Sequence, residues 1–162
     1  MDTLQFTRGV TELDIDMFRF PLCDQKKLAA LEKNNMQISD LNAYRAAIGN
    51  IELYGSVRFS WIPFSFPDAM IAPLSDFILS LVEAEVAVVC SLREDGVKLS
   101  ARSEDPAVSA GGLLYKALGG IGSGGGHASM GGGFIAKNRL PELGHYPREA
   151  IISLILKPLA LA

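Results

Sequence analysis

The sequence predicts an α/β protein in which helices flank a mixed β-sheet and a helical linker precedes that sheet. Residues 12–50 carry apolar side chains at helical spacing. Residues 51–103 contain segments rich in β-branched and aromatic residues, as strands do. The rest of the chain alternates between the two patterns around a glycine-rich stretch, which favours helices packed on a sheet.

Three helical segments are expected before the sheet. The first two lie in residues 12–31, and the second opens at Asp24, a residue type that commonly caps helix N-termini. The third runs from Asp40 to about Gly49. Its apolar face is expected to consist of Leu41, Tyr44 and Ile48.

Strands and helices are expected to alternate from residue 51 onward. The expected strands are residues 51–62, 86–90, 97–103 and 133–136, of which the second and third form a hairpin around a turn at residues 94–96. The expected helices are residues 69–81 with Pro67 at the first turn, residues 108–118, and a final helix from Pro147.

The composition is that of an ordinary globular domain, with 49% hydrophobic and 20% charged residues. A net charge of −3 argues against a nucleic-acid binder that relies on a broad basic surface. Residues 106–162 contain five basic and two acidic side chains and so carry +3, whereas the first 105 residues carry −6. An anionic ligand is therefore expected to prefer the C-terminal part.

Cysteine use and hydropathy indicate a cytoplasmic protein without a membrane partner. Cys23 and Cys90 show neither metal-ligand spacing nor a disulfide framework, and Cys90 lies in an apolar run, where a core role is expected. The N-terminus has no signal-peptide pattern. No apolar run approaches the roughly 20 residues that span a bilayer.

Residues 119–133 are the most informative segment, because nine of these fifteen residues are glycine. Such density indicates backbone that approaches a ligand closely or takes positive φ. Successive backbone N–H groups can form an anion-binding concavity, and His127 can add a hydrogen bond or a positive charge. A dinucleotide-binding fingerprint would follow a strand rather than a helix, and a P-loop would need a lysine. A flexible linker would have polar flanks and no histidine, whereas this segment contains His127 and is followed by an apolar strand pattern.

Gly124-Gly125-Gly126-His127, followed by small residues and Gly132-Gly133, resembles the GGGH signature of the C-terminal domain associated with DHH-family phosphoesterases. Residues 99–106 resemble the strand-end segment that precedes this signature, and residues 2–8 and 72–83 resemble other parts of the family. The likeness covers nearly the whole chain. Gly131 is a departure, since the family more often has alanine there; we expect it to affect loop stiffness more than chemistry.

The resemblance implies hydrolysis of phosphodiester or phosphoanhydride bonds in short oligonucleotides or related small phosphorylated nucleotides. It implies that residues 1–50 are the end of a DHH domain and a helical linker, and that residues 51–162 form a substrate-binding domain. The family holds two divalent metals, usually manganese, in its DHH domain. This chain has only two histidines and no Asp-His-His triplet, so we expect it to be an inactive fragment by itself, with Asp2 as a stranded metal ligand.

A substrate site follows from the same resemblance. The implied residues are Ser100, Arg102, Ser103, Gly124, Gly125, Gly126 and His127. Arg102 also has its own physical case, because it ends an alternating strand and its planar fork can bind phosphate through two hydrogen bonds. The alternatives are a surface arginine paired with Glu104 or Asp105, and a histidine that is structural. His145 is interpreted as a surface residue.

Two other functions stay open at this point. The chain can be a regulatory or dimerisation module whose apolar helices are buried in a homodimer. It can also be an independent hydrolase that uses His127 with Ser123 or Ser129, although the sequence assigns no acidic partner to that pair.

Overall fold

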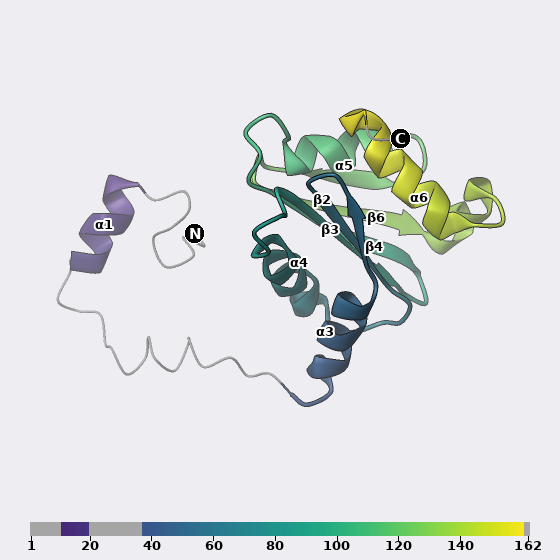
Figure 1. Ribbon diagram of the computed structural model, residues 1–162, viewed down its shortest axis with the longest axis horizontal. Helices are drawn as coiled ribbons and strands as arrows, with labels where there is room; N and C mark the ends of the chain where they lie inside the picture. Colours follow the sequence, from purple (N-terminus) through teal and green to yellow (C-terminus); the bar gives the residue numbers. More distant parts are fainter. Residues whose placement is uncertain (1–10, 20–36, 161–162) are drawn as a thin grey trace. The chain divides into compact units, whose positions relative to one another are not determined.

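The computed structural model describes residues 11–19 and 37–160 (Figure 1). The chain divides into two compact units between Met36 and Gln37. In the first unit, helix α1 (Glu12–Arg19) occurs where the periodicity predicted one. The expected helix at Asp24, together with Asp2 and Cys23, lies outside the described residues.

The second unit is built on one mixed sheet of six strands, which confirms the predicted α/β class. The strand order is β1-β2-β3-β4-β6-β5, and only β2 and β3 pair in parallel. The strands are β1 (Ile51–Tyr54), β2 (Val57–Ile62), β3 (Val86–Leu92), β4 (Gly96–Ser103), β5 (Ser123–Gly126) and β6 (Met130–Ala136). A helical crossover joins β2 to β3, as a parallel pair requires.

Helices cover both faces of this sheet (Figure 1). One face packs against α5 (Ala110–Leu118) and α6 (Pro147–Leu156), and the other against α3 (Asp40–Gly49) and α4 (Ile71–Leu79). Short 3₁₀ helices η1 (Asp68–Met70), η2 (Lys137–Leu143) and η3 (Lys157–Leu159) complete the unit. Pro67 therefore precedes η1, which leads into α4, instead of opening the α-helix itself.

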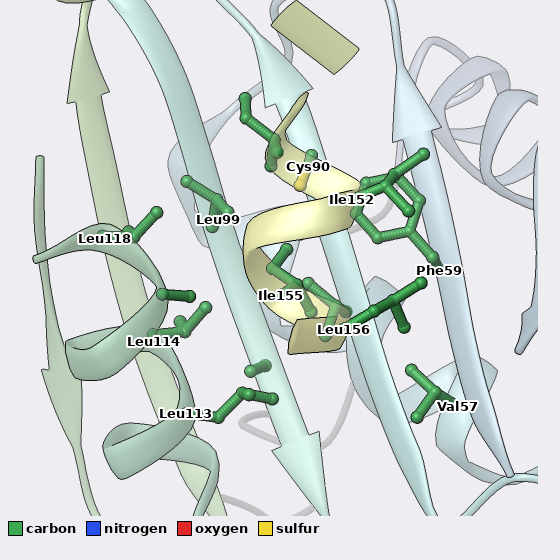
Figure 2. Packing of buried hydrophobic residues seen from close by; sticks show 14 of the residues in the cluster. Val57, Phe59, Cys90, Leu99, Leu113, Leu114, Leu118, Ile152, Ile155 and Leu156 are labelled. Atoms are coloured by element: carbon green, nitrogen blue, oxygen red, sulfur yellow. The ribbon is translucent and has the colours of Figure 1, made fainter. Parts of the chain in front are cut away.

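The larger core lies between the sheet and the α5–α6 layer (Figure 2). Figure 2 shows Leu114 and Ile155 from the two helices facing Leu99 on β4. Cys90 is fully buried in this cluster, which confirms its expected core role, and burial raises the pKa of its thiol.

Residues 51–62 form a hairpin rather than the single strand that the sequence predicted. The chain turns at Gly55, whose φ of 58° lies in the left-handed region that glycine adopts without steric cost. β1 then pairs antiparallel with β2, with Tyr54 opposite Val57. The alternating pattern is compatible with either arrangement, because both halves are strands.

Helix α3 has the predicted bounds, but of its predicted apolar face only Tyr44 packs against the core. Ala43 and Ala47 are buried, whereas Leu41 and Ile48 remain 52% and 53% exposed. The small alanines let the helix lie close to β2, where the hydroxyl of Ser60 donates a hydrogen bond to the Ala47 carbonyl at 2.8 Å. The predicted face is thus wrong at Leu41 and Ile48, because the close approach of the helix to β2 favours its small alanines there.

The glycine-rich segment is a β-hairpin, although the sequence predicted a loop before a short strand. β5 and β6 pair through four residue positions, and residues 127–129 form the turn. Helix α5 lies directly on the hairpin: a Cβ at Gly131 would come within 2.7 Å of the Ala110 carbonyl oxygen, and one at Gly124 within 2.7 Å of the Leu114 carbonyl carbon. Several glycines thus serve helix–sheet packing, and Gly131 is a packing position rather than a determinant of loop stiffness.

Candidate functional site

A cleft of about 350 Å³ lies at the start of α4, over the β4 and β6 strands. Its lining includes Lys98, Ser100, Arg102, His127 and the backbone of Gly126 and Gly132, with Ile71 and Ala72 on the α4 side. Side chains two residues apart on a strand share a face, so Lys98, Ser100 and Arg102 on β4 lie on one side of the sheet. The cleft therefore combines cations with glycine backbone.

The glycine backbone beside Ser100 carries no covering atoms on this face. Ser100 lies opposite Gly132 in the β4–β6 register, and Gly132 lies opposite Gly125 in the β5–β6 register. A Cβ added at either glycine would meet nothing within 4 Å. This row differs from Gly124 and Gly131, which contact α5, and it leaves peptide groups accessible to a ligand.

Arg102 is held in place by α4 and by its own strand. It is 7% exposed, and its Nε donates to Oδ1 of Asp76 at 2.7 Å. Its Nη1 donates to the Ser100 hydroxyl at 3.3 Å and to the Ala101 carbonyl at 3.1 Å. The partner carboxylate is thus Asp76, and the alternative of a surface pair with Glu104 or Asp105 is wrong.

His127 begins the turn between β5 and β6. Its backbone N–H donates to the Met130 carbonyl at 2.7 Å, and its own carbonyl accepts from the Gly111 N–H at 2.9 Å. These two bonds attach the turn both to β6 and to the first turn of α5, while the side chain stays exposed at the cleft. Within the described residues no hydrogen bond joins His127 to Ser123 or Ser129, so the independent-hydrolase hypothesis has no contact that favours it.

The cleft brings together four of the residues implied by the resemblance, namely Ser100, Arg102, Gly126 and His127. Gly125 lies one strand further out, beside Gly132. Two residues lie elsewhere: Gly124 packs on the backbone of α5, and the Ser103 hydroxyl donates to the Asp105 carbonyl at 3.3 Å.

Sequence reasoning missed Lys98 and Gly132 as cleft residues and Asp76 as the partner of Arg102. The signal for Lys98 was its position two residues before Ser100 on an alternating strand. The expected preference of an anionic ligand for residues 106–162 stays a prediction; both basic side chains of the cleft, Lys98 and Arg102, lie on β4.

A second hollow, of about 560 Å³, lies beside α3 and is lined by Asn42, Arg45, Gly49 and Phe64 among others. It is larger than the cleft, but among the described residues Arg45 is the only charged one in its lining, and no ion pair with another described residue fixes Arg45. In residues 11–19 and 37–160, no three His, Cys, Asp or Glu side chains group so that they could hold a metal ion. None of the described helices is long and apolar enough to cross a membrane.

The comparisons with known proteins identify the fold. No family model and no curated protein sequence matches the chain. Among solved structures, an exopolyphosphatase-related protein from Bacteroides fragilis is 20% identical, with a TM-score of 0.68 over 98% of this chain and 48% of that one. RecJ in complex with Mn²⁺ from Thermus thermophilus is 19% identical, with a TM-score of 0.54 over 75% and 16% of the two chains. An exonuclease RecJ bound to manganese is 17% identical, with a TM-score of 0.50 over 76% and 30%.

These neighbours are DHH-family proteins, so the sequence resemblance is confirmed at the level of the fold. The chain spans less than half the length of the exopolyphosphatase-related protein that it matches. The compact sheet unit begins at Gln37 and includes α3. The assignment of residues 1–50 to a catalytic-domain end and linker, and of residues 51–162 to a substrate domain, stays a prediction, as does the homodimer.

Proposed function

We propose that this chain binds the phosphate of a nucleotide or short oligonucleotide in the cleft, as the substrate-binding part of a phosphoesterase. The observation that carries this proposal is Arg102, which an ion pair with Asp76 fixes in the cleft beside uncovered glycine backbone. A guanidinium already oriented by the protein loses little entropy when it binds phosphate.

The hydrogen bonds of Arg102 leave one edge of its guanidinium for a ligand. Nε and Nη1 bond to protein atoms, and within the described residues Nη2 makes no hydrogen bond. A phosphate oxygen at Nη2 would lie near the backbone of Gly126 and near His127, which line the same cleft. An arginine, peptide N–H groups and an imidazole are groups that bind phosphate oxygens in proteins.

Hydrolysis in the parent protein is part of the same proposal. Similarity to the Mn²⁺ complex of RecJ supports a manganese-dependent partner domain, whose metals would activate the attacking water. The residues of this chain would bind the phosphate, orient it and shield it from solvent. Ser100, which accepts a hydrogen bond from Arg102, would help to keep the guanidinium in its orientation.

The replacement His127→Ala is expected to weaken binding of a 5′-phosphorylated dinucleotide about tenfold, as the loss of one hydrogen bond to a charged group does. Calorimetric titration of the full chain measures this change. His145→Ala is the matched control, because His145 is also exposed but is absent from the cleft lining. Equal affinities for wild type and His127→Ala would remove His127 from the proposed site.

The replacement Gly132→Val is expected to lower dinucleotide affinity at least about tenfold, while the free energy of unfolding changes by less than about 1 kcal/mol. Valine suits a strand, and no atom lies within 4 Å of the new Cβ, but the side chain would occupy the cleft. Calorimetry and thermal unfolding measure the two quantities. Gly49→Ala is the control, since its Cβ also meets open space, on α3. Unchanged binding by Gly132→Val would show that the ligand lies elsewhere.

A further inference from the structure

The hollow of about 560 Å³ beside α3 is lined by one side of that helix and by an aromatic ring. Asn42, Arg45 and Gly49 are three and four positions apart, so they lie on the same side of α3. Phe64, in the segment after β2, adds its ring to the lining and is 39% exposed. The volume falls within the roughly 300–1,000 Å³ of small-molecule sites. We call this cavity the α3 hollow; its lining is Asn42, Arg45, Ala46, Gly49, Asn50 and Phe64.

Arg45 brings an unpaired positive charge into the α3 hollow. Among the residues that the structure describes, its side chain has neither an ion pair nor a hydrogen bond, and the lining contains no acidic residue. Its guanidinium can therefore bind a carboxylate through two parallel hydrogen bonds. Asn42, on the same side of the helix, can donate its amide N–H groups to that carboxylate.

Asn50 gives the other end of the α3 hollow the opposite polarity. Its side-chain nitrogen donates to the Trp61 carbonyl at 2.8 Å, which fixes the carboxamide, and its Oδ1 accepts no hydrogen bond from another described residue. The last carbonyls of α3, which ends at Gly49, add the partial negative charge of a helix C-terminus. This end therefore favours an N–H or O–H donor. Asn50 follows Arg45 by five residues, roughly 7.5 Å along the helix axis.

The surface between these two ends carries little side-chain volume. Ala46 has a small side chain, and a Cβ added at Gly49 would meet nothing within 4 Å. A planar ring can thus lie along this side of the helix. The Phe64 ring lines the same space, and two aromatic rings attract each other beyond the effect of burying their area.

We propose that the α3 hollow binds an aromatic carboxylate that carries an N–H or O–H donor on the far side of its ring. The carboxylate lies at Arg45 and Asn42, the ring lies against Phe64, and the donor bonds to Asn50. This lining shares no residue with the cleft over β4 and β6, so the inference goes beyond the proposed function and does not depend on it. A bare inorganic anion would contact only the Arg45 end.

The test titrates the full chain with indole-3-acetate, indole-3-acetamide and inorganic phosphate and follows the backbone amides by nuclear magnetic resonance. We expect saturable binding of indole-3-acetate, with the largest changes at Arg45, Gly49 and Phe64. Indole-3-acetamide has the same ring without the charge, so its affinity is expected to be at least about tenfold lower. Inorganic phosphate has no ring and is expected not to saturate the α3 hollow.

Two variants test the two halves of the site. Arg45→Met is expected to lower the affinity for indole-3-acetate about tenfold or more and that for indole-3-acetamide by less than about twofold. Gly49→Leu is expected to weaken both ligands, because its side chain would occupy the hollow while its Cβ meets no neighbouring atom. Lys116→Met is the control, since it removes the same charge from an exposed position on α5 outside the lining.

Three results would overturn the inference. Equal affinities of wild type for indole-3-acetate and indole-3-acetamide, or unchanged binding by Arg45→Met, would show that Arg45 does not bind the carboxylate. Changes at Gly126 and His127 in place of Arg45 and Phe64 would locate the acid in the cleft. A folded wild-type sample that shows no saturable binding of indole-3-acetate would exclude the site altogether.

Discussion

Replacement of Arg102 by methionine is expected to lower the affinity for a 5′-phosphorylated dinucleotide about 100-fold or more. The substitution removes the cation that the cleft orients most firmly, together with the hydrogen bonds that its free edge can donate to phosphate. Charge-assisted hydrogen bonds contribute about 1.5–3 kcal/mol each, and two of them exceed a 100-fold change. Calorimetric titration measures the loss.

The Arg102 variants also separate geometry from charge. Arg102→Lys retains the charge but lacks the planar guanidinium with its paired N–H donors, so we expect a smaller loss of dinucleotide affinity, of about tenfold. Arg102→Met gives up the hydrogen bond to Asp76 as well, and its free energy of unfolding is expected to fall by about 1–3 kcal/mol. Circular dichroism before each titration shows whether the variant is folded. A folded Arg102→Met protein that binds the dinucleotide as wild type does would exclude Arg102 from the site.

Replacement of Gly111 by alanine is expected to destabilise the protein by about 3 kcal/mol. A Cβ at this position would lie 2.6 Å from the carbonyl oxygen and 2.7 Å from the Cα of Gly126, so α5 must move away from the β5–β6 hairpin. Backbone atoms cannot rotate aside as a side chain can, and overpacking of this kind exceeds the roughly 1 kcal/mol that alanine gains over glycine in a helix. Chemical denaturation measures the difference.

The neighbouring residue Gly112 provides the matched control. A Cβ there meets only the side chain of Ser109, at 3.2 Å, so Gly112→Ala is expected to change stability by less than about 1 kcal/mol. The two variants differ by one position on the same helix. Similar stabilities for both would mean that α5 does not pack on the hairpin backbone at Gly126.

The strands that local pattern determines were predictable from the sequence. The apolar run at residues 86–90 and the alternation at residues 97–103 each correspond to one strand, and they form the expected hairpin. The β5–β6 hairpin was not predictable in this way, because glycine has no side chain with which to mark an inward or outward face. Helix α5, the element directly before the hairpin in the chain, packs on its glycines, and this tertiary contact does not appear in the local sequence pattern.

The candidate site, like the fold, was predictable from the sequence only in part. Arg102 and His127 follow from the resemblance, and the fold places both at one cleft. Asp68 and Arg93 come from separate elements, and only the folded chain brings them to Lys98. A lysine on an alternating strand is usually interpreted as a solvated residue, so the sequence alone offered no reason to count Lys98 in the site.

The most direct test of phosphate recognition in the cleft is a nuclear magnetic resonance titration of the isotope-labelled full chain with a 5′-phosphorylated dinucleotide. We expect the largest changes at the backbone amides of Gly125, Gly126, His127 and Gly132 and at Nε of Arg102, with little change on α3 and α6. Changes centred on the hollow lined by Asn42, Arg45 and Phe64, or no change in a folded sample, would contradict phosphate binding at this cleft.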